Sequence, residues 1–163
     1  EDLKKAALKH TLQACDSTVS GPGRTVEIPV CYGGDFGPDI ETVAHTNGLS
    51  VEEVITIHTA TSYPIYMLGF APGFPYLGGL DPRLHTPRLE TPRARVEAGS
   101  VGIANAQTGI YPLPSPGGWQ VIGRTPLRLF APEMDDPVPY YQPGDRLEFV
   151  SISRQKFNRL LES

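Results

Sequence analysis

The chain has 163 residues, of which 14 are Lys or Arg and 18 are Asp or Glu, so its formal net charge is −4. A charge this close to neutral argues against a nucleic-acid-binding surface as the main role of the protein. Glycine and proline contribute 17 residues each, which predicts a turn-rich, mainly β fold rather than a helical bundle.

The cysteines, the N-terminal residues and the longest uncharged run exclude further classes of protein. The two cysteines, Cys15 and Cys31, have a spacing that matches no zinc or redox motif. The first residues are charged and lack the apolar run of a secretion signal, so we expect a cytoplasmic protein. The uncharged run 54–80 contains prolines and glycines that would break a helix in lipid, so no membrane contact is expected.

Residues 1–23 are expected to be separate from the main domain. Apolar residues recur at helical spacing over 2–14 and predict a short amphipathic helix, and the polar run 17–23 predicts a hinge. The chain begins at Glu1 without a Met, so we expect a fragment whose helix and hinge are the remnant of, or the linker to, a missing N-terminal domain. Residues 24–163 then form one domain.

Two adjacent helices are predicted in the first half of this domain and one at its end. The first is expected to open at Gly37-Pro38-Asp39 and to stop near Asn47-Gly48. Ser50-Val51-Glu52-Glu53 has the sequence of a capping box, so the second helix is expected over 51–59. The last helix is expected over 155–161.

Short strands occupy most of the remaining domain. β-branched and polar residues alternate over 25–31 and predict a strand, and Pro29 within it is typical of a sheet edge. The run 63–70 predicts a buried strand. Further strands are predicted at 101–104, 120–122, 127–130 and 146–153. Many short strands with helices at one end predict a closed or nearly closed β-barrel with two or three short helices.

Three uncharged strings rich in glycine, proline and aromatic residues mark the candidate site. They are 69–77, 107–112 and 115–119. Loops of this kind supply backbone N–H donors and aromatic walls for a small-molecule pocket. The alternative is that the glycines serve only tight turns at the rim of the barrel.

His58 and Trp119 each have two interpretations from the sequence. His58 is a candidate general base, but no carboxylate is close in sequence, and a packed histidine explains it equally well. Trp119 is either a core plug or a pocket wall. None of the four histidines has the spacing of metal ligands, so no metal site is expected.

Polar residues in and between the strings are candidate ligand contacts. Arg88 and Arg93 each follow a proline, and the pair either binds an anion or is simply exposed. Gln107 and Tyr111 are stronger candidates, because polar groups in a loop between strands have few structural duties.

Several strings in one order resemble the subunit-1 family of allophanate-hydrolase-type proteins. The family includes the B subunit of the bacterial ATP-dependent 5-oxoprolinase and the sporulation kinase inhibitor of bacilli. The resemblance covers about 26–151, with Asn105 where the family usually has glycine and Glu97 where it usually has proline. It rests on the strings 27–32, 69–77, 99–104, 107–112, 115–119 and 122–126.

The resemblance implies a cyclophilin-like β-barrel and an enzyme assembled from several chains. By analogy, this chain pairs with a homologous subunit-2 (C) protein and a lactam-binding A subunit to open 5-oxoproline to glutamate. ATP is used by the assembled complex, and no cofactor is expected on this domain. The implied catalytic residues are His58, Arg88, Gln107 and Tyr111. The implied substrate-binding residues are Phe74, Arg93, Thr108, Gly117, Gly118 and Trp119.

The resemblance also implies an alternative function, inhibition of a sporulation sensor histidine kinase by binding its dimerisation helices. An aromatic groove of Phe70, Phe74, Tyr76 and Trp119 suits a proline-bearing helix or loop, and prolyl isomerase activity is a weaker third idea. Arginine and glutamine side chains that point inward favour a small anionic ligand, whereas an open aromatic groove favours a peptide. The metabolic subunit is our first hypothesis.

Overall fold

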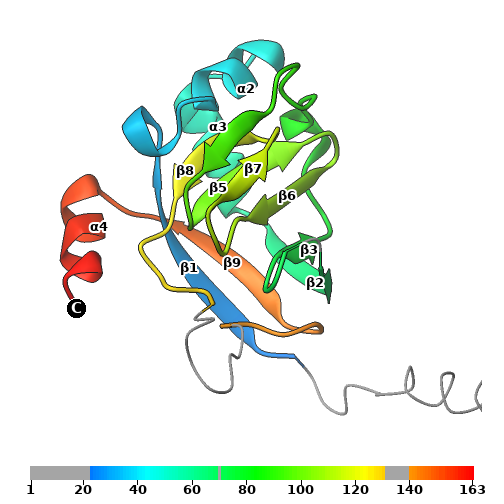
Figure 1. Cartoon of the computed structure of the whole chain (residues 1–163). Helices are drawn as coiled ribbons and strands as arrows, with labels where there is room; N and C mark the ends of the chain where they lie inside the picture. The colour runs from blue at the N-terminus through cyan, green and yellow to red at the C-terminus, as the bar shows by residue number, and fades with distance from the viewer. Residues whose placement is uncertain (1–22, 70, 131–139) are drawn as a thin grey trace, which may run out of the picture.

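The computed structural model describes residues 23–69, 71–130 and 140–163 (Figure 1). Within these ranges the chain forms nine strands and three α-helices. The predicted helix over 2–14 and nearly all of the predicted hinge over 17–23 lie outside the described residues.

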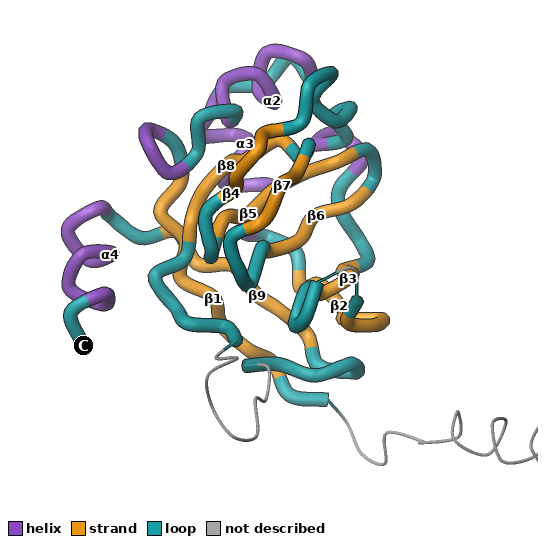
Figure 2. The backbone as a smooth tube through the Cα atoms, in the orientation of Figure 1, coloured by secondary structure: helices purple, strands orange, loops and turns teal. Residues whose placement is uncertain are grey.

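Seven strands make one sheet in the order β3-β2-β9-β1-β8-β5-β6. Their bounds are β1 (Thr25–Tyr32), β2 (Ser62–Leu68), β3 (Pro75–Leu77), β5 (Ser100–Ala104), β6 (Gln107–Ile110), β8 (Gln120–Arg124) and β9 (Arg146–Ser151). β1 and β9 run parallel and the other pairs are antiparallel. The two end strands, β3 and β6, contact each other, so the sheet curls into a nearly closed barrel (Figure 2). The predicted mainly β barrel is therefore confirmed.

Two further strands, β4 (Arg93–Val96) and β7 (Ser115–Gly117), pair only with each other among the described residues. We call this antiparallel pair the ribbon. Arg93 lies opposite Gly117 in it, and Val96 lies opposite Ser115. The ribbon leads directly into β8 and so connects to the barrel.

The barrel interior is filled by residues that alternate along the strands. On β9, for example, Leu147 and Phe149 are buried while their neighbours on the chain are not. The largest of the fully buried side chains include Tyr63, Phe149, Ile28, Ile103 and Leu147. This alternation also decides which residues face outward from the barrel.

The helices cover one end and one side of the barrel (Figure 1). α2 (Ile40–Thr46) and α3 (Val51–Thr59) lie at one end, and α4 (Arg154–Leu161) packs beside β1. The capping box of α3 is present: Glu53 N donates to Ser50 Oγ at 3.1 Å and Ser50 N donates to Glu53 Oε2 at 2.7 Å. The predictions for all three of these helices agree with the observed bounds to within a few residues.

Three strand predictions need correction. The first concerns β1, which is an interior strand and not the sheet edge that Pro29 predicted. Pro29 is tolerated because β8 pairs only with Cys31 and Tyr32, so at Pro29 the strand has a hydrogen-bonded neighbour, β9, on one side only. The run 127–130 is not a strand; it buries Leu129 without joining a ladder. The strand predicted over 63–70 is buried only in its first half, as the exposure of its side chains shows.

The second half of β2 carries two large apolar side chains in solvent. Tyr66 is 72% exposed and Met67 is 55% exposed. Tyr63 and Ile65, in the first half, are buried. No helix in the part of the chain that the structure describes is long and apolar enough to cross a membrane.

Candidate functional site

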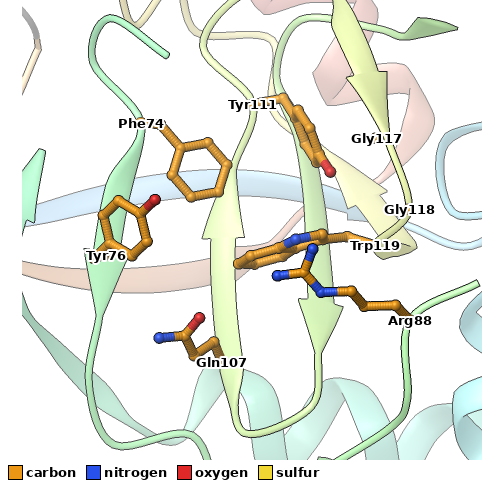
Figure 3. Close-up of a pocket in the computed structure, with 8 residues that line it drawn as sticks. All are labelled: Phe74, Tyr76, Arg88, Gln107, Tyr111, Gly117, Gly118 and Trp119. Atoms are coloured by element: carbon orange, nitrogen blue, oxygen red, sulfur yellow. The ribbon is translucent and has the colours of Figure 1, made fainter. Parts of the chain in front are cut away.

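A pocket of about 100 Å³ opens where β3, β6 and the ribbon meet (Figure 3). Its size suits a small metabolite rather than a drug-sized ligand, whose pockets measure roughly 300–1,000 Å³. The residues that line it are Phe74, Tyr76, Arg88, Gln107, Tyr111, Gly117, Gly118 and Trp119.

Strand alternation sorts the residues of the string 107–112 between the pocket and the core. Gln107, Gly109 and Tyr111 share one face, on which Gln107 and Tyr111 line the pocket. Thr108 and Ile110 point the other way and are buried in the barrel. The expectation that Gln107 lies in a loop was wrong, because it begins β6.

Glycines in the strings make space for aromatic rings. A Cβ on Gly109 would lie 2.9 Å from Phe74 Cζ and 3.2 Å from Trp119 Cζ3. A Cβ on Gly117 would overlap the hydroxyl of Tyr111. These two glycines lie in strands β6 and β7, so the turn-only interpretation does not explain them.

Phe74 is the centre of the aromatic wall. Its ring meets those of Tyr76, Tyr111 and Trp119 edge-on, at centroid distances of 5.6, 5.6 and 5.3 Å. Trp119 is only 7% exposed and packs with this buried cluster, yet it also lines the pocket. Trp119 is therefore both a core plug and a pocket wall.

Arg88 is the one charged side chain among the described lining residues. Its Cζ lies 5.9 Å from the centroid of the Trp119 ring, a cation–π geometry. It has no carboxylate partner among the described residues, and Gln107 lies on the opposite side of the pocket (Figure 3). The pocket thus offers a positive charge and an amide to a ligand.

Tyr111 adds a hydroxyl that stays protonated at neutral pH. Burial raises its pKa, against a backbone hydrogen bond at Trp119 and the charges of Arg88 and Arg93, which lower it. The hydroxyl therefore serves as a hydrogen-bonding group and not as a general base near pH 7.

His58 lies in the core and not in the pocket. It is fully buried and stacks on Phe149 at a centroid distance of 4.5 Å. Thr108 Oγ1 donates to Gly102 O at 2.9 Å, so His58 Nε2, 2.9 Å away, must donate to Oγ1. His58 Nδ1 then accepts from the hydroxyl of Tyr32 at 2.7 Å. Burial lowers the pKa of His58 to about 3, so the packed-histidine interpretation fits this position.

Arg93 is also separate from the pocket. Its Nη1 and Nη2 donate to Asp39 Oδ2 at 2.7 Å and to Asp39 Oδ1 at 2.8 Å. Hydrogen bonding to Asp39 raises the pKa of Arg93. Arg93 lines a different cleft, of about 140 Å³, together with Arg95 and Arg124. Neither the anion-binding nor the exposed-arginine interpretation anticipates this partly buried ion pair.

The two departures from the family pattern are accommodated away from the pocket. Asn105 takes a φ of 52°, a conformation that glycine and asparagine adopt most readily, and it is exposed. Glu97 accepts a hydrogen bond from Arg95 Nε at 2.7 Å and lines the second cleft.

The structure brings together seven of the ten candidate residues and leaves His58, Arg93 and Thr108 outside the pocket. Tyr76, which the sequence analysis named only in the aromatic groove of the alternative function, also lines the pocket, whereas Phe70 of that groove lies outside the described residues. The sequence could have indicated this position, because Tyr76 comes two residues after Phe74 and side chains two residues apart in a strand lie on the same face of the sheet. Within the described ranges, no three His, Cys, Asp or Glu side chains gather as a metal site would require.

The fold and the pocket define a class: a small β-barrel domain with a small pocket that combines aromatic walls with one arginine and one amide side chain. The family model of the carboxyltransferase domain, subdomain C and D, matches residues 2–140. The chain therefore belongs to this carboxyltransferase-domain family, which agrees with the resemblance in the sequence.

Two relatives align with most of this chain. It is 57% identical over 139 residues to the B subunit of 5-oxoprolinase from Bacillus subtilis, covering 85% of this chain and 58% of that protein. The corresponding 5-oxoprolinase B subunit of Escherichia coli O157:H7 is 54% identical over 127 residues, with 78% and 58% covered. The chain thus spans somewhat more than half the length of these relatives.

A solved structure shares the fold. The crystal structure of a conserved uncharacterized protein from Pyrococcus horikoshii superposes with a TM-score of 0.78 and 52% sequence identity. The match covers 95% of this chain and 68% of that one. The barrel described here is therefore an architecture that this relative shares.

Proposed function

We propose that this chain is the ligand-binding part of the B subunit of a cytoplasmic 5-oxoprolinase. It acts with a subunit-2 (C) protein and a lactam-binding A subunit, and the assembled complex uses ATP to open 5-oxoproline to glutamate. The relatives named above support this proposal. The observation that carries it is the position of Arg88, a pocket cation beside an aromatic wall and opposite an amide.

The pocket chemistry matches the functional groups of 5-oxoproline. The guanidinium of Arg88 pairs with the carboxylate of the ligand. The amide of Gln107 and the hydroxyl of Tyr111 hydrogen-bond to the lactam group, and the wall around Phe74 and Trp119 packs against the five-membered ring. These groups bind and orient the ligand.

The pocket does not supply the hydrolytic chemistry by itself. Its described lining contains no carboxylate and no histidine, and burial raises the pKa of its Tyr111 hydroxyl. In this proposal the other subunits activate the lactam with ATP, and no cofactor is assigned to this domain. Its contribution is to hold the lactam carbonyl in a fixed orientation.

The test is ATP-dependent hydrolysis of 5-oxoproline by the full-length protein copurified with its neighbouring subunit-2 protein and its A subunit. Arg88→Ala removes a charge-assisted hydrogen bond, for which we expect a loss of roughly 10- to 100-fold in kcat/KM. Gln107→Ala should lower it less, because a neutral hydrogen bond is weaker.

The matched control is Arg83→Ala, which removes an exposed arginine of the same segment that pairs with Asp81 instead of lining the pocket. Full activity of Arg88→Ala would place the ligand elsewhere. A stable complex without turnover, or no complex, would contradict the proposal and bring the kinase-inhibitor alternative forward.

A further inference from the structure

The ribbon carries one wall of the pocket. Gly117 ends β7, and Gly118 and Trp119 follow it before β8 begins. The segment bearing Arg88 is attached to the same place, because Leu89 N donates to Gly118 O at 2.7 Å. We call Arg88, Gly117, Gly118 and Trp119 the ribbon wall.

One carboxylate, that of Asp39 at the start of α2, bonds both to the ribbon beside the ribbon wall and to the barrel strand β8. Arg93, which lies opposite Gly117 in the ribbon, forms both hydrogen bonds of its guanidinium fork with this carboxylate. Val121, two residues after Trp119, donates its N–H to Asp39 Oδ2 at 2.7 Å. Asp39 N donates in turn to Val121 O at 2.9 Å.

The burial of this ion pair makes it a strong connection. The side chain of Asp39 is 10% exposed and that of Arg93 is 33% exposed, so solvent screens the pair less than the surface pairs. The planar guanidinium satisfies both carboxylate oxygens at once, which a lysine ammonium does not reproduce. At the other end of β4, Val96 packs in the buried cluster that contains Phe74 and Trp119. The strand is therefore held by an apolar contact at Val96 and by an ion pair at Arg93.

We propose that Arg93 and Asp39 are positioning residues for the pocket: their ion pair holds the ribbon wall at the distance from β6 at which Arg88 and Gln107 engage one ligand. Neither residue lines the pocket. The inference rests on the proposed function for the identity of the ligand, but the placement of the wall is measurable without any ligand.

The first measurement is the fluorescence of Trp119, which is the only tryptophan of the chain and stands in the ribbon wall. Arg93→Lys keeps the charge and removes the fork. We expect a red-shifted Trp119 emission and greater quenching by acrylamide at a temperature where the variant is fully folded by circular dichroism.

The matched control is Arg95→Lys, two residues along the same strand. Arg95 pairs with Glu97 in solvent and has no bond to Asp39. We expect its emission and quenching to equal those of the wild type. Asp39→Asn, which keeps an oxygen for Val121 N–H and removes the charge, should reproduce the effect of Arg93→Lys, and the two combined should add little.

The second measurement is titration of the 163-residue chain with 5-oxoproline. Substitutions that act through another residue typically change binding by about 0.5–2 kcal/mol, so we expect Arg93→Lys to weaken binding by roughly 2- to 30-fold. Arg95→Lys should bind as the wild type does.

The outcomes separate the two proposals. Wild-type emission and quenching in both Arg93→Lys and Asp39→Asn would overturn the positioning role, as would an equal change in Arg95→Lys. If the emission changes only in the Asp39 and Arg93 variants while the wild type binds no 5-oxoproline, the positioning role stands and the proposed function is overturned. If Arg93→Lys does not fold, Asp39→Asn decides the question by the same readout.

Discussion

Acidification below about pH 6.5 is expected to destabilise the fold through His58. The imidazole is buried and neutral, and both of its nitrogens are engaged by Tyr32 and Thr108. A second proton would have to enter this desolvated network, whereas in the unfolded chain it binds freely to an imidazole in water. His58→Gln removes the titrating group and keeps an amide that donates and accepts.

The magnitude follows from the pKa of His58, about 3 in the fold against an ordinary 6.5. Between these values the unfolded chain binds the proton and the folded chain does not, so stability is full above pH 6.5 and falls as the pH drops toward 3. At about 1.36 kcal/mol for each pKa unit, the loss from pH 7.5 to pH 5 is about 2 kcal/mol. Hydrogen bonds from Arg83 lower the pKa of Asp81 to about 2. The stability that this carboxylate contributes is therefore lost only when the pH falls below 3.8, its ordinary pKa.

The assay is urea denaturation at pH 7.5, 6 and 5, followed by Trp119 emission. We expect the wild type to lose about 2 kcal/mol over this range. His58→Gln should be less stable at pH 7.5 by about 1–3 kcal/mol but nearly independent of pH down to 5. His45→Gln, at an exposed histidine of α2, is the matched control and should keep the wild-type dependence. An unchanged pH dependence in His58→Gln would refute the buried-network account.

Three further substitutions, one of them paired with a control, test other parts of the fold. Gly109→Ala places a methyl group 2.9 Å from Phe74 Cζ. We expect urea denaturation to show a loss of stability of about 1–3 kcal/mol, together with loss of 5-oxoproline binding. A stable variant with wild-type affinity would contradict this. Phe157→Ala removes a ring that is 1% exposed and should lower the free energy of unfolding by about 3–5 kcal/mol. The control is Leu161→Ala: Leu161 is 58% exposed, and its removal should lower the free energy of unfolding by under about 0.5 kcal/mol. Equal losses would be incompatible with the packing of α4 on β1. Ser50→Ala deletes the capping box and should lower stability by about 1 kcal/mol in thermal melting, and an unchanged melting temperature would count against the cap.

The helices were predictable because their signals are local. The capping box that starts α3 lies within four consecutive residues, and the two bonds that define it join Ser50 and Glu53. α2 stops where Gly48 takes a φ of 65° and Leu49 N donates to Ala44 O at 2.9 Å. These interactions join residues that are close neighbours in the chain, so the order of residues alone specifies them.

The short strands of the candidate site were harder to predict. β6 and β7 fall in strings whose glycines indicate turns, whereas Gly109 and Gly117 are there because rings from other strands occupy the space of a side chain. Conversely, the run 127–130 alternates Leu127, Arg128 and Leu129 as a strand does, but it has no neighbour among the described residues with which to form a ladder. Strand formation depends on a partner, and the partner is distant in the chain.

The sequence by itself determined the mainly β class, the helix bounds and the strings that build the pocket, because composition, caps and the family pattern are properties of neighbouring residues. Only the tertiary structure decided which polar residues face the pocket. Asp39 and Arg93 are 54 positions apart, and His58 and Thr108 are 50 apart. Each pair comes within hydrogen-bonding distance only when the chain folds, because its two residues lie on different elements. Strand alternation then directs each strand side chain either to the core or to the pocket.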